Sequence, residues 1–144
     1  MFPDRDALRA AVEALSDEDV ARVSIDLPLR ANLSAQENIA LIPLYLGHLD
    51  APTAAAQALA LLDRLGQAPI AALRDPDLSP AQRFVAKLAR ALILGRPRLV
   101  IDRPGAMLYD VAYPQFLQQL AARCDAVPTW EIYDFDWNQA LYPA

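Results

Sequence analysis

Apolar residues follow two different patterns along this chain. In some stretches they recur every three or four residues, which predicts helices with one apolar face. In other, shorter stretches they form compact runs rich in branched or aromatic side chains, which predicts strands. The expected helices cover residues 5–15, 35 to about 43, 53–65, 80–94 and the region around 116–121, and the expected strands cover residues 20–25, 99–101 and 129–133.

Capping residues mark where several of these helices begin. Two helices follow a serine that has a glutamate or glutamine three residues later, which is the capping-box pattern. The pairs are Ser34 with Glu37 and Ser79 with Gln82. Pro80 fits the first helical position after its serine, whereas Pro43 is expected to kink or end the earlier helix. Asp110 or Tyr113 is expected to cap the helix around residues 116–121.

The run Leu99-Val100-Ile101 follows a turn signal at Gly95 and Pro97 and is short and wholly apolar. This pattern is typical of a strand that is buried on both faces. Asp102 comes directly after the run, at the carboxyl end of the expected strand, which is where open α/β sheets bind their ligands. The aspartate is therefore the first candidate for a functional side chain.

Composition narrows the class of protein. The 144 residues are 55% hydrophobic and carry a net charge of −5, which predicts one folded domain and argues against nucleic acid as a partner. Cys124 is the single cysteine, so we expect a packing role in a reducing, cytoplasmic compartment. Charged residues interrupt the amino terminus, so no signal peptide is expected. No apolar run reaches the roughly 20 residues that span a bilayer, so no direct membrane insertion is expected.

Residues 77–104 resemble the signature helix and Walker B strand of the ATP-binding-cassette (ABC) ATPases. That family has a Leu-Ser-Gly-Gly-Gln signature that opens a helix, followed by a strand that ends in Asp-Glu-Pro. The matching segments here are Leu78-Ser79-Pro80-Ala81-Gln82-Arg83, Ala89-Arg90-Ala91-Leu92 and Leu99-Val100-Ile101-Asp102-Arg103-Pro104. The run from Leu33 to Leu41 resembles the start of the family's helical subdomain.

The resemblance implies an α/β fold in which a small parallel sheet of about three strands has flanking helices. Residues 28–95 would form an ABC-like helical subdomain, and residues 16–27 and 96–138 the residual Walker B core. In the family, the P-loop strand lies beside the strand that matches residues 129–133. Without it, that strand would be an exposed sheet edge, covered by the tail 137–142, by the helix 5–15, or by a partner chain.

The residues that carry ATP chemistry in the family differ here. No G-x-x-x-x-G-K-[ST] phosphate loop occurs in the 144 residues, and Lys87 is the only lysine. Several of the family's other motif positions also hold a residue of different chemistry. Arg103 replaces the general-base glutamate, Pro80 and Ala81 replace two signature glycines, Ile25 falls at the Q-loop glutamine, and Phe135 replaces the H-loop histidine.

Arginine has no acceptor and does not lose its proton, so it cannot act as a base. We expect Arg103 to pair with Asp102 and to fill the space that a metal would use. Ser79 is expected to act as a helix cap rather than a phosphate ligand. Vestigial nucleotide contacts would come from Ser79, Gln82, Asp102 and Arg103, and we expect no catalytic residue, metal site or cofactor.

The remaining polar candidates favour structural interpretations. His48, the single histidine, follows Gly47 and is expected at the surface. Asp134 and Asp136 follow the last expected strand and could hold a cation, but a solvated loop is the favoured interpretation.

These departures predict a non-hydrolysing, ABC-ATPase-like protein that binds another protein. The partner would be an ABC ATPase, a transporter membrane subunit or a second copy, and it could hold the protein at the inner membrane. The expected contacts are Leu29, Leu33 and Tyr45, with Leu46, on the helical side, and Trp130, Tyr133 and Trp137 near the last strand. The alternatives are an ATPase subunit that completes a composite site with a partner, and a remnant adapted to an unrelated scaffold role.

Overall fold

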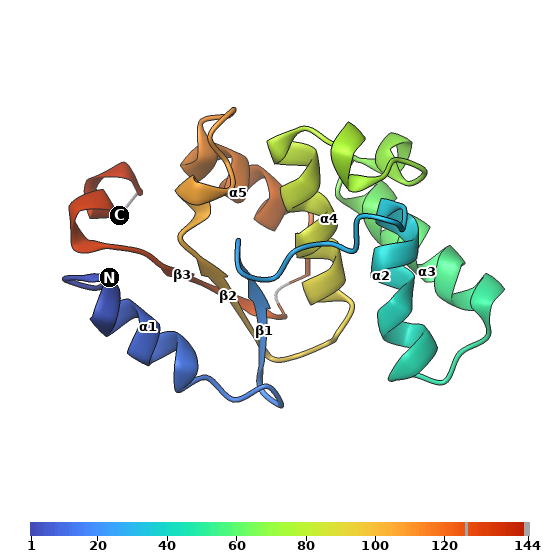
Figure 1. Ribbon diagram of the computed structural model, residues 1–144, viewed down its shortest axis with the longest axis horizontal. Coiled ribbons are helices and arrows are strands. Elements are labelled where there is room, and N and C mark those ends of the chain that lie inside the picture. The colour runs from blue at the N-terminus through green and yellow to red at the C-terminus, as the bar shows by residue number, and fades with distance from the viewer. Residues whose placement is uncertain (126, 143–144) are drawn as a thin grey trace.

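A three-stranded parallel sheet lies at the centre of the molecule (Figure 1). The computed structural model describes residues 1–125 and 127–142. The strands are β1 (Val20–Val23), β2 (Arg98–Asp102) and β3 (Thr129–Tyr133), in the order β1-β2-β3, and both pairings are parallel. The predicted α/β class and the strand number are confirmed.

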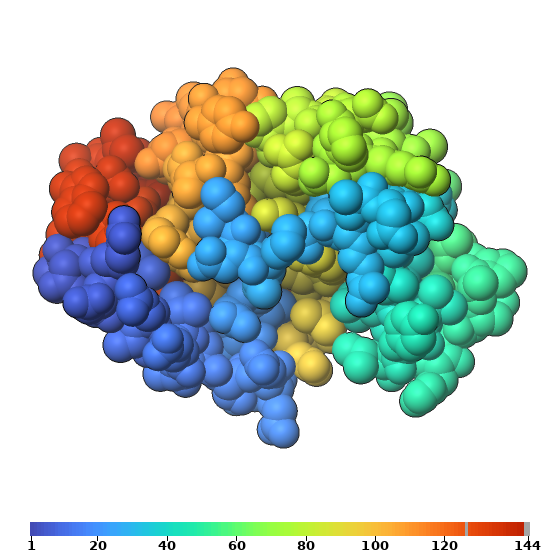
Figure 2. All heavy atoms as spheres, in the orientation of Figure 1, coloured from blue at the N-terminus to red at the C-terminus, as the bar shows by residue number. Residues whose placement is uncertain are grey.

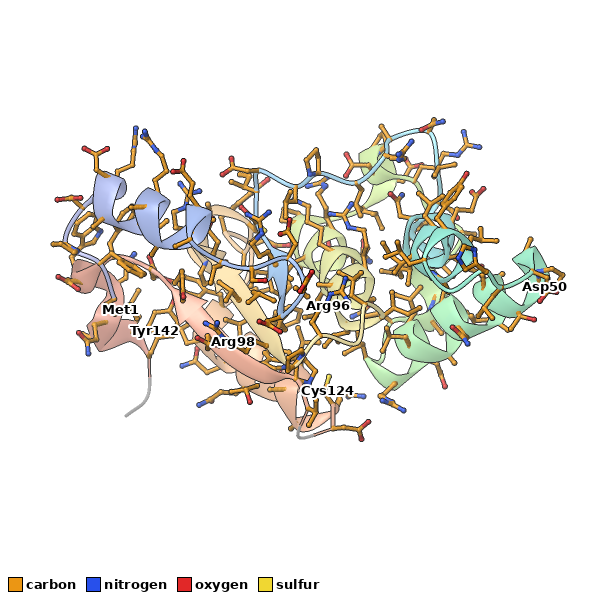
Figure 3. All side chains as sticks on the ribbon, turned by 90° about the horizontal axis from the view of Figure 1, so that it is seen from below. Met1, Asp50, Arg96, Arg98, Cys124 and Tyr142 are labelled. Carbon is orange, nitrogen blue, oxygen red and sulfur yellow. The ribbon has the colours of Figure 1, made fainter. Side chains whose placement is uncertain are left out.

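In the described residues, five α-helices and several short 3₁₀ turns surround the sheet. The helices are α1 (Arg5–Glu13), α2 (Ala35–Tyr45), α3 (Ala51–Arg64), α4 (Pro80–Leu92) and α5 (Tyr113–Ala122), and a 3₁₀ segment covers Asp136–Leu141. α4 and α5 lie next to the sheet, and α2 and α3 lie beyond α4 (Figure 1). α1 and the carboxyl-terminal segment lie together at the opposite end, where Met1 and Tyr142 are close neighbours (Figure 3).

One hydrophobic cluster joins the sheet to the helices. Leu99 and Ile101 of β2 are fully buried, and so are Phe84, Val85 and Leu88 on α4. The same cluster continues through Ile39 of α2 and Leu62 of α3. Because side chains alternate along a strand, only every second residue of β2 faces these helices.

The helix starts agree with the sequence for α2 and α4. At both, the serine side chain accepts the backbone N–H of the third helical residue, and that residue's side chain accepts the serine's own N–H. Two other expectations were wrong, namely that Pro43 could end α2 and that Asp110 or Tyr113 caps α5. α2 continues through Pro43 to Tyr45, because the N–H groups of Leu46 and Gly47 still bind the carbonyls of Ile42 and Pro43.

The N-cap of α5 is Ala112, and neither Asp110 nor Tyr113 caps this helix. The Asp110 carboxylate lies instead at the start of α4, where it accepts the Ala81 N–H at 3.4 Å. Tyr113 is the first residue of α5 and makes an edge-on contact with the ring of Tyr142.

Both outer strands have an edge without a neighbouring strand. At the β3 edge, Phe2 pairs in parallel with Phe135, just beyond the end of the strand. Its N–H donates to the Asp134 carbonyl at 2.9 Å, and its carbonyl accepts the Asp136 N–H at 2.8 Å. The residues before α1 therefore cover the end of this edge, where the sequence left α1, the tail or a partner as alternatives. No helix in the described residues has the length and apolar character needed to cross a bilayer.

Candidate functional site

Three polar side chains lie at or just beyond the carboxyl ends of the strands. Ser24 follows β1, Asp102 ends β2 and Asp134 follows β3, and all three are buried. Because the strands are parallel, their carboxyl ends meet at the same edge of the sheet, which is where this class of fold binds ligands.

Asp102 is only 2% exposed, and both of its oxygens are occupied. Arg103 donates from Nε to Oδ1 at 2.8 Å and from a terminal nitrogen to Oδ2 at 3.2 Å, and the Ser24 hydroxyl also donates to Oδ2, at 3.1 Å. The same Arg103 nitrogen reaches Asp26 at 3.0 Å. The predicted Arg103–Asp102 pair is present.

Arg103 holds this position with a left-handed backbone, at φ 47°. Such a conformation is unusual for a residue with a long side chain. Its hydrogen bond to Asp102 raises the pKa of the Arg103 guanidinium, and the charges of Asp102 and Asp26 act in the same direction. A permanently charged donor therefore lies against the one buried carboxylate at the end of β2. This arrangement provides no proton acceptor at position 103, and its positive charge would repel a metal ion beside Asp102.

Cations from α4 hold the loop that follows β1. Lys87 donates to the Ser24 carbonyl at 3.2 Å, and Arg90 donates to the carbonyls of Leu27 and Pro28 at 2.6 and 2.8 Å. Burial lowers the pKa of both side chains, and repulsion from Arg90 and Arg83 lowers that of Lys87 further. Ile25, at the position of the family's Q-loop glutamine, is 48% exposed in this loop.

The amino end of α4 corresponds to the signature loop of the resemblance. Pro80 has no N–H, the Ala81 N–H donates to Asp110, and the Gln82 N–H donates to the Ser79 hydroxyl. The Arg83 N–H binds the Ser79 carbonyl at 2.8 Å, and the Ser79 N–H binds the Gln82 side chain at 2.9 Å. Every backbone donor of this turn is therefore bound within the chain, and Ser79 and Gln82 serve each other as caps.

Asp134 is not part of a solvated loop, contrary to the sequence-based interpretation. It is 2% exposed. Its Oδ1 accepts the Phe135 N–H at 2.8 Å and the Asn138 amide at 3.0 Å, and its Oδ2 accepts the Tyr142 hydroxyl at 2.7 Å. Burial and this hydrogen bond raise the pKa of Tyr142 well above its ordinary value. Asp136 is exposed, and Phe135 stacks on Trp137 with ring centroids 4.4 Å apart.

A groove of about 620 Å³ lies between β1, α2 and α4. Figure 2 shows the surface hollowed between the segment around β1 and α2, with residues near 95 at its floor. Tyr45 and Leu46 at its rim are 73% and 62% exposed. Four arginines and one aspartate supply its charged side chains. They are Arg22, Arg30, Arg90, Arg96 and Asp17.

The expected contacts on the helical side divide between core and surface. Tyr45 and Leu46 line the groove, whereas Leu29 is 7% exposed and belongs to the hydrophobic core. Leu29 is therefore not a surface contact. Leu33 lies in the turn that precedes α2 and is half-buried. It does not line the groove.

The aromatic residues expected near β3 also differ in exposure. Trp130 packs against the core and lines an apolar hollow of about 300 Å³ together with Ile132, Met1 and Tyr142. Tyr133 is half-buried and its ring contacts that of Phe2, at 5.1 Å between centroids. Trp137 is 65% exposed.

The other polar candidates form no site. His48 is exposed, with a left-handed backbone at φ 52°. Cys124 is half-buried, and burial raises the pKa of its thiol. Across the described ranges, 1–125 and 127–142, no three His, Cys, Asp or Glu side chains are arranged to hold a metal ion.

Sequence analysis missed several side chains of this region. Ser24 and Asp26 follow the first strand. Their position at the end of a strand parallel to β2 could have predicted that they lie near Asp102. Lys87 was noticed only as the single lysine, although it stands on the apolar side of its helix between Phe84 and Ala91. Nothing in the sequence indicated that Asp110 would bind the start of α4, because only the folded chain brings these residues together.

Comparison with solved structures identifies the fold. One similar structure is described as the dimeric, post-hydrolysis state of the ATP-binding cassette MJ0796 bound to ADP and Pi, and another as dimeric MJ0796, a bacterial ABC transporter cassette. Both superpose with a TM-score of 0.67 at 23% sequence identity, over 87% and 86% of this chain. The chain therefore has an ABC-ATPase-like fold, as the resemblance implied.

This chain spans 59% of the length of each of those cassettes. No protein-family model matches the sequence, and no curated protein matches it either.

Proposed function

We propose that this protein is an ABC-ATPase-like component that does not hydrolyse ATP by itself and acts by binding another protein. The observation that supports this most directly is the double hydrogen bond from Arg103 to Asp102. The resemblance assigns position 103 to a proton-accepting glutamate, and arginine has no acceptor for a proton. The buried aspartate that would face a metal already has a permanent cation as its partner.

The start of α4 supports the same proposal. In the resemblance, glycines at positions 80 and 81 would let backbone N–H groups approach a phosphate. Here Pro80 has no N–H, and the Ala81 N–H is directed to Asp110. A phosphate at this turn would have to displace the oxygen acceptors that these N–H groups already bind, at a loss of about 1 kcal/mol for each hydrogen bond.

The groove between β1 and α2 is the surface that we assign to the partner. Exposed apolar side chains at its rim and an excess of arginine over acidic residues favour a segment with apolar and acidic side chains. We propose an amphipathic helix of a transporter membrane subunit as the occupant. Binding of an ABC ATPase, or of a second copy of this chain, would be the other outcomes of the test.

The first experiment measures whether the 144-residue chain uses ATP. We expect no turnover and no rise in melting temperature with Mg-ATP, for the natural protein and for Asp102→Ala alike. A ligand at 100 times its Kd would stabilise the fold by about 2.7 kcal/mol. Stabilisation of that size by Mg-ATP, lost in Asp102→Ala, would contradict the proposal. If it appeared only with a partner present, the composite ATP site would be the correct alternative.

The second experiment tests the groove. A variant with Tyr45→Ala and Leu46→Ala should lose co-purification with a co-expressed transporter membrane subunit, because both side chains are exposed at the rim. Leu141→Ala is the matched control, since Leu141 is 53% exposed at the other end of the molecule. Unchanged recovery of the double variant would exclude this surface, and recovery of only a second copy would indicate self-association instead.

A further inference from the structure

Lys87 is a buried cation without a carboxylate partner. It lies on the inner side of α4 and is 5% exposed. Its ammonium group donates to the Ser24 carbonyl at 3.2 Å, and among the ion pairs of the described residues none includes Lys87. Lysine is rarely buried without an opposite charge, because removing an ammonium group from water is costly.

The two carboxylates whose charges act on Lys87 already have other partners. Asp75 accepts from Arg83 at 2.7 Å, and Asp26 accepts from Arg103 at 3.0 Å. Arg90, a second cation near Lys87, donates to the backbone carbonyls of Leu27 and Pro28 and forms no ion pair within the described residues. The region around Lys87 therefore has a positive charge that these carboxylates do not balance. Burial and repulsion from Arg90 and Arg83 lower the pKa of Lys87, as expected for such a cation.

A cavity of about 130 Å³ adjoins this lysine. Lys87 and Phe84 line it from α4, Met107 lines it from the segment after β2, and Ile25 and Tyr109 have 48% and 74% of their surface exposed beside it. Arg83 also lines it, but its charge is matched by Asp75. An apolar cavity of about 150 Å³ in another protein holds benzene, so this one suits a ligand of about six non-hydrogen atoms.

We propose that this cavity binds a small aliphatic carboxylate, whose head group pairs with the Lys87 ammonium and whose apolar stem lies against Phe84 and Met107. A carboxylate supplies the missing opposite charge, and a charged hydrogen bond in a buried site is stronger than a neutral one. The mostly apolar walls favour a hydrocarbon stem over a fully hydrated anion such as phosphate. This assignment does not depend on the function proposed above.

The single lysine provides a direct test by NMR. With ¹³C,¹⁵N-lysine labelling, the side chain of Lys87 gives one set of signals. Butyrate, which has about the size stated above, should shift these signals in a saturable manner and raise the pKa of Lys87, because a bound opposite charge favours the ammonium form. Butyramide has the same shape without the charge and should bind at least tenfold more weakly, since a hydrogen bond between two charged groups is stronger than one to a neutral amide.

Two variants complete the experiment. Lys87→Met keeps the stem without the charge and should lower butyrate affinity at least tenfold, measured by calorimetry. Arg22→Met removes a half-buried cation from the groove and should leave the butyrate affinity unchanged. Signals that do not respond to butyrate would overturn the proposal, and so would equal binding of butyramide. Equal binding of inorganic phosphate would indicate an unselective anion site and would overturn the assignment too. The comparison of butyrate with butyramide on the natural protein stands even if Lys87→Met does not fold.

Discussion

Asp102 and Asp134 occupy equivalent places in the fold and are stabilised in different ways. Both lie at the carboxyl edge of the sheet, and both are 2% exposed. A guanidinium and a hydroxyl bind Asp102, whereas a backbone N–H, an amide and a phenol bind Asp134. One buried carboxylate is therefore neutralised by an opposite charge, and the other is held by neutral donors.

The difference shows what each carboxylate stabilises. The partners of Asp134 lie one to eight residues further along the chain, so this carboxylate fastens the segment after β3 to the end of its own strand. Asp102 instead joins its own neighbour to Ser24, 78 residues away. It therefore connects β2 with the loop after β1. Only at Asp102 does a permanent charge fill the position where the resemblance would place ATP chemistry.

The largest expected effect comes from removing the cation that pairs with Asp102. Arg103→Met keeps a long side chain but leaves Asp102 buried without its cation, so the free energy of unfolding should fall by about 3 kcal/mol, measured by urea denaturation. The estimate takes the lower end of the range for buried pairs, because the Arg103 side chain is 26% exposed.

The matched control is Arg103→Met combined with Asp102→Asn, which removes both charges. This double variant should be more stable than Arg103→Met alone, because no unpaired charge stays buried. If Arg103→Met lowered the free energy of unfolding by no more than a surface ion pair contributes, about 0.5 kcal/mol, Asp102 would not depend on the charge of Arg103.

A smaller effect is expected at Asp134. Tyr142→Phe removes one of three neutral donors, and a hydrogen bond to a charged group contributes about 1.5–3 kcal/mol. Because two donors remain, we expect a loss near the lower value, measured by thermal or urea unfolding. Leu141→Ala, at the exposed neighbouring residue, is the control and should change stability little.

Tyr142 also gives a pH dependence with a defined sign. Its pKa is raised in the folded state, so its contribution to stability is complete below the unfolded tyrosine pKa of about 10 and is lost as the pH rises above that value. Tyr142→Phe should therefore show a shallower loss of stability above about pH 10. Some slope should remain, because burial also raises the pKa of Tyr113. Identical slopes would mean that the folded state does not raise the pKa of Tyr142.

The smallest effect is expected for Ser24→Ala. This change removes the hydroxyl that donates to Asp102, but Arg103 still binds both carboxylate oxygens. We expect a loss of about 1 kcal/mol. In the Arg103→Met background the same change should cost more, because Ser24 would then be the remaining side-chain donor to Asp102. A double-mutant cycle with equal costs in both backgrounds would show that the two donors act independently.

Local patterns in the sequence predicted which helices and strands form, and the resemblance to the ABC ATPases implied the class of fold. The capping boxes at Ser34 and Ser79 formed as predicted, since all their hydrogen bonds join residues three apart. The pair between Arg103 and Asp102 was also predictable, because the two residues are adjacent and oppositely charged. The end of α2 was not predictable in this way, because the carbonyls of Ile42 and Pro43 accept the N–H groups of Leu46 and Gly47, and periodicity does not reveal these bonds.

Residues far apart in the sequence met only through the tertiary structure. Asp110 was expected to cap α5 but binds the start of α4, and Leu29 was expected at the surface but packs in the core. The tertiary structure also brings Phe2 to Phe135, and it places Lys87 beside its cavity. Sequence alone determined which elements form, because helix caps and strand runs depend on neighbouring residues. The partner of each buried charge was decided by packing, because burial removes water and leaves only the groups that the fold brings within reach.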